Sequence, residues 1–333
     1  MSIKKIINDP NSVATDLLDG LVDYYNGSIK LISPGAIVKN YIQDDKVGLL
    51  VGGGSGHEPS YHGYVGKNLA DGASCGDIFA APPPNITLEV ARAINKGKGV
   101  LFLYGNYAGD VLNFDLASNL AKSEGIEVET VLVWDDVASA PPDEKHKRRG
   151  IAGLLPIVKL AGAASNIATS LEELKSIVVK ARDNTRSVGA ALKPGSIPAT
   201  GLPTFQLNEN EIGLGMGIHG EAGVSIEQMM SSDELTVLML DLIFKDDLPL
   251  DSNDEIILFI NSLGSTTLME CLIVLKKVKE ILSKMGIKLY DIIVGPKVTC
   301  QEMAGVSISI TKLDTDLKKY WDMPCSSLGY TKL

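Results

Sequence analysis

Two of the four histidines stand in glycine-rich loops that resemble each other. His57 lies in the run GSGHE at 54–58, and His219 lies in GMGIHGE at 215–221. Glycines let the backbone approach a ligand closely, and an imidazole presented there can act as acid, base or nucleophile. Each loop follows an apolar run, at 47–51 and at 212–214, that is typical of a buried strand. Both histidines are therefore expected at strand ends, where open α/β sheets bind ligands.

Asp110 ends a third loop of this kind. It closes the run GNYAGD at 105–110, between a strand-like segment at 100–104 and a helical pattern. A carboxylate near a helix N-terminus is stabilised by the free N–H groups there, so capping alone would account for it. A functional role is an equal alternative, and it gains weight because the loop lies on the same expected side of the sheet.

The other candidates near these loops carry weaker signals. His62 and His146 are interpreted as non-catalytic, since the spacing of His62 from His57 does not match a helical zinc site. Glu58 and Glu221 could orient an imidazole, but residues so close in sequence seldom face one another, and a loop or solvent role is favoured. The glycine block at 52–56 lacks the Gly-Lys-Ser/Thr of a phosphate loop and the register of a dinucleotide fingerprint.

The elements that would position these residues alternate between strand and helix patterns. Strands are predicted at 47–51, 99–104, 129–134, 187–192, 211–216, 255–261, 288–294 and 305–311. Helices are predicted at 85–96, 109–124, 150–167, 170–183, 233–246, 265–286 and 313–320. The run SLEE at 170–173 predicts a capping-box helix start.

This alternation predicts two α/β domains, each with a mixed, mostly parallel sheet flanked by helices. A Pro/Gly-rich connector at 193–198 places the boundary near residue 185. The N-terminal domain, 1–185, would carry the His57 and Asp110 loops, and the C-terminal domain, 186–333, would carry the His219 loop.

Composition and charge narrow the class of protein. The 333 residues carry a net charge of −10, which opposes binding to nucleic-acid phosphates. The one basic cluster, KHKRR at 145–149, is interpreted as a solvated loop or helix start. Four widely spaced cysteines form no metal-binding pattern, and no apolar run reaches the length of a membrane span. We expect a cytoplasmic protein that contacts neither membrane nor nucleic acid directly.

Many short motifs resemble the K subunit of dihydroxyacetone kinases (DhaK) of the type that depends on the phosphotransferase system. The resemblance runs nearly end to end. It includes IINDP at 6–10, GGGSGHEP at 52–59, GYVG at 63–66, CGDIF at 75–79, NY and GD at 106–110, NF at 113–114, RGIAG at 149–153, GIHGE at 217–221, LGST at 263–266 and WDMP at 321–324.

The resemblance implies a role for each site residue. His219 would bind the ketone carbonyl of dihydroxyacetone covalently as a hemiaminal. His57 and Asp110 would serve as acid/base groups, and the backbone at Gly54, Ser55 and Gly56 would contact the substrate. It also implies a homodimer with no cofactor of its own, because ADP and magnesium would reside on a partner L subunit.

The chain departs from the family pattern beside these loops. Gly105 replaces a lysine that contacts the sugar, Ala108 replaces a hydroxyl residue, and Ala80, Ala81 and Thr267 also differ. The resemblance then leaves three alternatives. The slight preference is for a dihydroxyacetone-sensing coactivator, similar to the non-kinase paralogue DhaQ, whose partner would be a tetracycline-repressor-like transcription factor. The alternatives are the substrate-binding subunit of the kinase, and a kinase subunit for another small ketose such as erythrulose.

Overall fold

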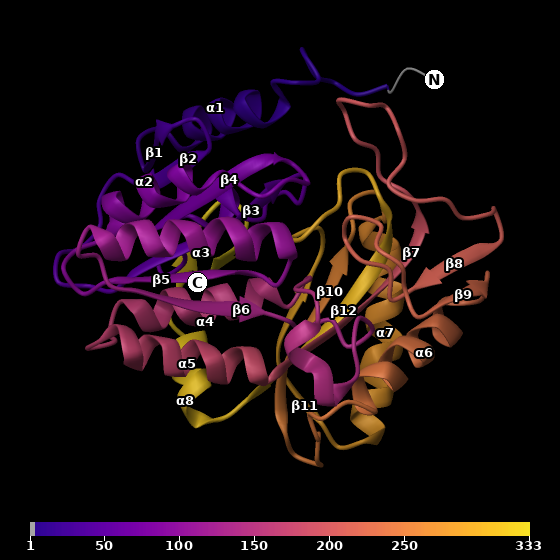
Figure 1. Cartoon of the computed structure of the whole chain (residues 1–333). Coiled ribbons are helices and arrows are strands. Elements are labelled where there is room, and N and C mark those ends of the chain that lie inside the picture. Colours follow the sequence, from indigo (N-terminus) through magenta and orange to yellow (C-terminus); the bar gives the residue numbers. More distant parts are fainter. Residues whose placement is uncertain (1–3) are drawn as a thin grey trace.

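The computed structural model describes residues 4–333, which form two α/β units side by side (Figure 1). Each unit is one sheet with the helices that cover it, and we call the two units the first and second layers. The first contains α1 (Val13–Tyr25), β1 (Ile29–Ser33), β2 (Ala36–Lys39), β3 (Gly48–Ser55), η1 (His62–Tyr64), β4 (Gly72–Ile78), α2 (Pro84–Ile94), β5 (Val100–Gly105), α3 (Ala108–Ser123), β6 (Val128–Val133), η2 (Pro142–Lys147), α4 (Leu154–Ser165) and α5 (Leu171–Asp183).

The second layer contains β7 (Thr185–Lys193), β8 (Glu211–Leu214), β9 (Ser225–Gln228), α6 (Ser232–Phe244), β10 (Glu255–Ser262), α7 (Leu268–Lys284), β11 (Lys288–Val294) and β12 (Ala304–Leu313). The chain then ends in α8 (Thr315–Trp321), β13 (Cys325–Ser326) and β14 (Thr331–Lys332). Two α/β units with mixed sheets flanked by helices are therefore confirmed.

The first sheet has the strand order β1-β2-β4-β3-β5-β6. The pairings from β4 through β3 and β5 to β6 are parallel, and β1 and β2 add an antiparallel edge. Its strands are buried on both faces: Leu50 and Phe102 pack with α2 and α3, while Leu49 and Leu101 pack with α4 and α5. Because β3 and β5 are parallel neighbours, their carboxyl ends bring the His57 and Asp110 loops to one edge.

The second sheet corrects part of the expectation. Its order is β11-β10-β12-β7-β8-β9, and of these neighbours β10 and β11 pair in parallel while the other four pairings are antiparallel. The prediction of a mostly parallel sheet is wrong here, because the loop at 215–224 joins β8 and β9 as an antiparallel hairpin and β12 runs back between β10 and β7. The His219 loop is consequently the connection of an antiparallel pair rather than a βα loop.

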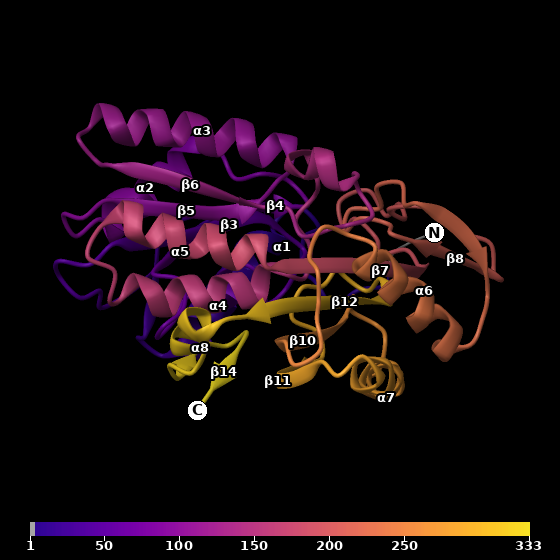
Figure 2. The same cartoon turned by 90° about the horizontal axis from the view of Figure 1, so that it is seen from below.

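The last segment of the chain returns to the first layer. Helix α8 packs against α4, where the Lys159 ammonium donates to the Tyr320 carbonyl at 2.7 Å. The Gly329 N–H also bonds to the Gly63 carbonyl at 2.8 Å. This packing is visible from below (Figure 2). Strand β7 is the first strand along the chain that belongs to the second sheet, and it begins at the predicted boundary near 185. The division into domains itself stays a prediction.

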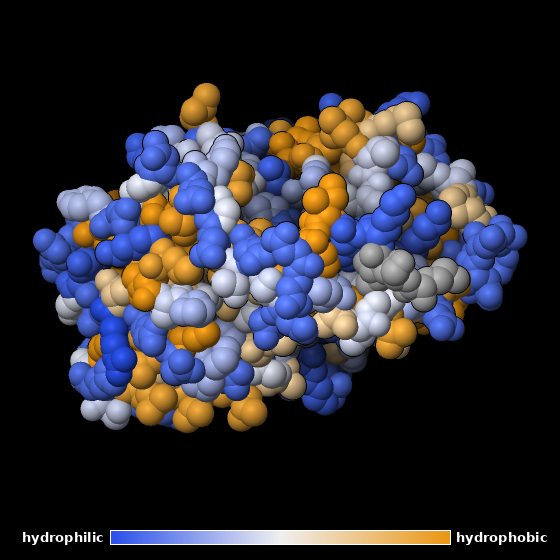
Figure 3. Space-filling model, turned by 90° about the horizontal axis from the view of Figure 1, so that it is seen from above, coloured by the Kyte–Doolittle hydropathy of each residue, from blue (hydrophilic) through white to orange (hydrophobic). Residues whose placement is uncertain are grey.

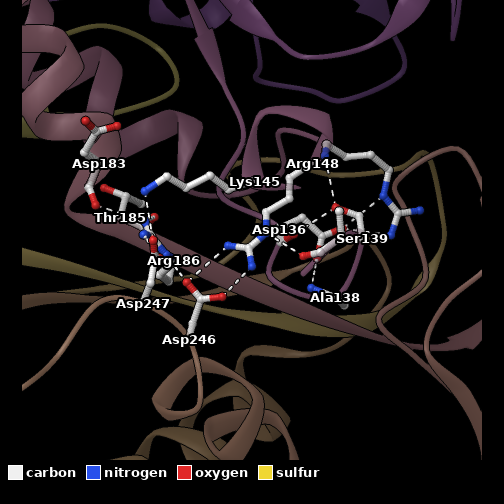
Figure 4. A network of polar contacts seen from close by, with 12 residues as sticks. Asp136, Ala138, Ser139, Lys145, Arg148, Asp183, Thr185, Arg186, Asp246 and Asp247 are labelled. Carbon is white, nitrogen blue, oxygen red and sulfur yellow. Dashed lines mark hydrogen bonds and ion pairs between the residues drawn. The ribbon is translucent and has the colours of Figure 1, made fainter. Parts of the chain in front are cut away.

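The basic cluster at 145–149 lies at the junction of the two layers, and part of it is buried. The Arg148 side chain is fully buried and forms a two-pronged ion pair with Asp246, at 3.1 and 2.5 Å. Arg186 of β7 joins the same carboxylate at 2.5 Å and also contacts Asp247 (Figure 4). The interpretation of a solvated loop is therefore wrong for Arg148, because Asp246, which follows α6, pairs with its charge across the junction.

The surface seen from above is dominated by hydrophilic side chains with separate apolar patches (Figure 3). Within residues 4–333, no helix combines the length and the apolar character needed to cross a membrane.

Candidate functional site

His57 lies just past the end of β3, held in a tight loop. Gly56 has a φ of +104°, and a Cβ there would lie 2.7 Å from the Phe79 ring, so glycine is required. The His57 side chain is only 2% exposed, and its Nδ1 lies 2.8 Å from the Thr299 carbonyl oxygen. A carbonyl oxygen accepts but never donates, so Nδ1 carries the ring proton and Nε2 is left with its lone pair.

His219 lies in the loop between β8 and β9, with its side chain 24% exposed. Its Nδ1 lies 2.9 Å from one Glu221 carboxylate oxygen, and its backbone N–H donates to the other at 3.0 Å. The expectation of a loop or solvent role for Glu221 is therefore wrong. Gly220 between them has a φ of +86° and turns the chain back, so that residues two apart face one another.

The structure brings the two histidines together. Their Nε2 atoms lie 2.9 Å apart, and the ring centroids are 4.8 Å apart at a steep angle. Burial, and then the nearby His219, lower the pKa of His57 to about 3, so its ring is neutral at pH 7. Because both Nδ1 atoms face acceptors, a hydrogen bond between the two Nε2 atoms requires one further proton on one of the rings.

Glu221 places a negative charge beside the His219 ring. Burial alone would raise the pKa of Glu221, but the hydrogen bonds from His219 outweigh burial and lower it to about 2. The carboxylate is thus ionised at neutral pH and faces Nδ1 of His219 at 2.9 Å. The contact between the two rings therefore lies next to a fixed negative charge.

Asp110 occupies the first turn of α3 and is 7% exposed. Its Oδ1 is buried and has no hydrogen-bond partner within residues 4–333, and no side chain caps this helix. The structure therefore does not support the alternative that Asp110 only caps helix α3. Burial raises the pKa of Asp110 to about 7, against an opposing effect of His219, so the carboxyl lies within electrostatic reach of that ring. An unpartnered carboxyl poised near neutral pH is suited to exchange protons with a ligand.

The loop at 54–56 is already well connected. The Ser55 hydroxyl donates to the Gly76 carbonyl at 2.6 Å, and the Gly56 N–H donates to the Glu58 carboxylate at 2.7 Å. Glu58 thus supports the loop backbone, which corrects the preference for a solvent role. Substrate contacts by Gly54, Ser55 and Gly56 stay a prediction.

Three groups beside the histidines were not singled out from the sequence. The Phe79 ring lies 5.1 Å from the His57 ring and 5.5 Å from His219, and the Tyr107 ring lies 4.8 Å from His219. Thr299 supplies the carbonyl that fixes the His57 tautomer. Phe79 and Tyr107 belong to motifs that carry the family resemblance, whereas no pattern in the sequence marks a backbone carbonyl 242 residues away from His57.

Gly105 ends β5 beneath the site. A Cβ at this position would lie 3.1 Å from the Tyr107 ring, whose hydroxyl donates to the Gly150 carbonyl at 2.9 Å. The ring of Tyr107 therefore covers the place from which a longer side chain at 105 would project.

The remaining two histidines take no part in the contact between His57 and His219. His62 is buried, and burial lowers its pKa to about 4; His146 lies in η2, where its carbonyl accepts from Asn106. Residues 4–333 contain no group of three or more His, Cys, Asp or Glu placed to hold a metal ion. The expectation that nucleotide and magnesium reside on a partner stays a prediction.

Comparisons with known proteins agree with these features. The Dak1 domain family matches residues 19–329. The dihydroxyacetone-binding subunit DhaK of a PTS-dependent dihydroxyacetone kinase from Listeria innocua is 38% identical over 96% of this chain and 97% of its own length. A D-erythrulose kinase from Mycolicibacterium smegmatis is 38% identical over 98% of this chain, which spans only 56% of that enzyme.

Among solved structures, the dihydroxyacetone kinase operon co-activator DhaQ superposes with a TM-score of 0.88. It is 28% identical, and the match covers 94% of this chain and 97% of that one. The chain therefore belongs to the Dak1 domain family and is of the DhaK type.

Proposed function

We propose that the protein captures dihydroxyacetone covalently on His219, as a hemiaminal. The observation that carries this proposal is the contact between the two Nε2 atoms, with both Nδ1 atoms held by acceptors. Such a pair supplies a nucleophilic nitrogen and a proton at the same point, and addition to a ketone needs both.

The proposed step balances as follows. The Nε2–Nε2 contact opens to admit the ketone, and His57 takes the proton that His219 holds at Nε2. The freed lone pair attacks the carbonyl carbon, the new C–N bond forms as the C=O π bond breaks, and His57 returns the proton to the oxygen. The His219 ring keeps its Nδ1 proton and its positive charge, which Glu221 neutralises.

Covalent capture suits a very small ligand. A triose has too few atoms for tight binding by non-covalent contacts alone, since the free energy available per atom is limited. It also selects ketones over the corresponding alcohols, because glycerol has no carbonyl carbon to attack. Asp110, with its unpartnered oxygen, would accept a hydrogen bond from a hydroxyl of the bound ketose.

Carbon-13 NMR tests the capture directly. Dihydroxyacetone labelled at its carbonyl carbon should lose its ketone signal in the presence of the protein and gain one in the region of tetrahedral carbons. The signal should be absent with His219→Ala. A labelled ketone that keeps only its free ketone and hydrate signals in the presence of the folded wild-type protein would exclude covalent capture.

Two fates of the bound ketose are proposed. The first is sensing: the protein would report dihydroxyacetone to a tetracycline-repressor-like transcription factor as a coactivator. The observation that favours it is Gly105, which leaves position 105 without the cation that the family's lysine would supply, in a space that Tyr107 partly covers. Support also comes from the fold shared with the co-activator DhaQ.

The second fate is phosphorylation by a partner L subunit that holds ADP and magnesium. The observation that favours it is Asp110, a buried carboxyl with a pKa of about 7 that is able to accept the proton of the attacking hydroxyl. The DhaK relatives support this candidate too. Under either fate we expect a homodimer, and a kinase subunit for erythrulose remains the third alternative.

A reconstituted assay separates the fates. The protein is mixed with a phosphorylated donor system, an ADP-loaded L subunit and either dihydroxyacetone or erythrulose. Sensing predicts adduct without phosphorylated product. Product at a rate comparable with a DhaK subunit measured in parallel would contradict sensing, and the better substrate would identify the ketose.

A further inference from the structure

An arginine from the other layer joins the two ends of the loop that carries His219. We call these two ends, Gly215 and Ala222, the neck of the loop. Arg149 precedes α4, and its Nη2 donates to the Gly215 carbonyl at 2.9 Å. Its Nη1 reaches the Ala222 carbonyl at 3.4 Å. These carbonyls stand at the two ends of the segment 216–221, so one guanidinium joins both sides of the loop.

The guanidinium is itself fixed. Asp136 is buried, and its carboxylate accepts from Arg149 Nε at 3.0 Å and pairs with Nη2 at 2.8 Å. The same carboxylate accepts from the Ala138 N–H (Figure 4). The Ser139 hydroxyl accepts from the Arg149 N–H. The Arg149 side chain is 12% exposed. A planar fork paired in this way has one preferred orientation, which a lysine cannot reproduce.

The tip of the loop is anchored by Ile218, which is buried and whose carbonyl accepts from the Cys300 thiol, whereas Arg149 joins the two ends of the loop to each other. Gly215 and Gly220 both have positive φ, and the bonds within the loop join Gly217 to Gly220 and Glu221. A Cβ at Gly217 would meet both Glu221 Oε2 and Arg149 Nη1, so the guanidinium packs beside the carboxylate that holds the His219 ring. The loop must nevertheless keep Nε2 of His219 at the His57 ring of the other layer.

We propose that Arg149, held by Asp136, is a positioning residue that keeps His219 aligned with His57 for ketone capture. The proposal rests on the proposed function. Arg149 touches neither reacting atom. It acts through the neck of the loop, and a loop free to shift by about 1 Å would lose on the order of 100-fold in the rate of addition.

The test compares adduct formation in the full-length wild-type protein, Arg149→Met and Arg149→Lys, with carbonyl-labelled dihydroxyacetone followed by NMR. Both variants should form the adduct ~10–100-fold more slowly than wild type, with Arg149→Lys the less affected. Circular dichroism establishes that each is folded. Arg182→Met is the matched control, because Arg182 also forms an ion pair near the junction, with Asp183, but has no bond to the loop.

Chemical rescue separates positioning from general loss of structure. Millimolar guanidinium should restore part of the rate to Arg149→Gly and leave the Arg182→Met rate unchanged. If Arg149→Met formed the adduct as fast as the wild-type protein does, the inference would be overturned and the proposed function would be left intact. A wild-type protein that forms no adduct would overturn the proposed function itself.

Discussion

At the scale of single residues, the state of four ring nitrogens decides what the site can do. The Thr299 carbonyl and the Glu221 carboxylate face the two Nδ1 atoms, so a proton between the two Nε2 atoms would be available for the proposed ketone addition. Either histidine alone would provide a nucleophile or an acid, but not both in one place. The pairing explains why two loops from distant parts of the chain must converge.

Glu221→Gln should weaken capture. A glutamine oxygen still accepts from Nδ1, but the negative charge that stabilises the cationic ring is lost. Removing a charge-assisted bond costs about 1.5–3 kcal/mol, so the adduct dissociation constant should rise ~10–100-fold. Titration with labelled ketone measures it. Glu227→Gln, further along the same hairpin, is the control, and equal dissociation constants for Glu221→Gln and wild type would contradict the role given to the charge.

Asp110→Asn should change the pH dependence of stability. The unfolded carboxyl has a pKa near 3.8, whereas burial raises it to about 7 in the folded protein. Between these values the folded state binds more protons, so the contribution of Asp110 to stability falls as the pH rises from about 4 to 7. The variant, which has no charge to bury, should gain on the order of 2–4 kcal/mol over wild type between pH 4 and pH 8.

Urea unfolding at the two pH values measures that difference. Asp115→Asn, exposed on the same helix, serves as the control and should show little of this gain. A stability difference between Asp110→Asn and wild type that does not change with pH would mean that the carboxyl is ionised throughout this range.

At the scale of elements, the ends of β3, β5 and β8 position the site. The buried apolar runs and glycine loops predicted β3 and β5, and with them the placement of the His57 and Asp110 loops at one edge of the sheet. The capping residue Ser170 was also predicted: its hydroxyl accepts from the Glu173 N–H, although the Glu173 carboxylate bonds to Thr169 instead of completing the box.

Other elements could not be predicted from local pattern. Strand β4 has the composition GASCGDI, and its Gly, Ser and Asp are poor strand formers; its burial between β2 and β3 makes it a strand. The antiparallel pairing of most strands in the second sheet was also not predicted, because buried parallel strands and buried antiparallel strands have the same apolar pattern. Thr299 and Arg149 act through contacts between distant segments, which periodicity does not encode.

Gly105→Lys should create the missing cation at the end of β5. The φ of Gly105 lies outside the left-handed region, so the backbone admits a Cβ, which requires the Tyr107 ring to shift by a few tenths of an ångström. If the protein is a sensor for lack of this lysine, the variant should phosphorylate dihydroxyacetone about tenfold faster in the reconstituted assay. Gly105→Met, of similar length but uncharged, should gain nothing; equal rates for the two variants would place the cause elsewhere.

At the scale of the whole molecule, the two layers are joined by charge as well as by apolar packing. Arg148, Arg186 and two aspartates form a buried network at the junction, and α8 ties the end of the chain to α4 (Figure 4). Because His57 and His219 come from different layers, the junction sets the distance between them.

Arg148→Met should destabilise the protein by about 3–5 kcal/mol, since Asp246 would keep a buried charge with one partner fewer. Chemical denaturation measures it, and Arg92→Met, which removes an exposed ion pair with Glu124, should cost less than about 1 kcal/mol. Equal losses for the two variants would show that the junction network does not hold the layers together.

The central claim is that a ketone becomes covalently attached to His219. A crystal structure of the protein with dihydroxyacetone tests it most directly, because a hemiaminal carbon lies at the length of a single C–N bond, about 1.5 Å, from Nε2 of His219, whereas a ketone bound without a covalent bond stays at van der Waals distance. The account predicts a tetrahedral carbon bonded to Nε2 of His219 in the wild-type protein and none in His219→Ala. A planar ketone at van der Waals distance from Nε2 would contradict it.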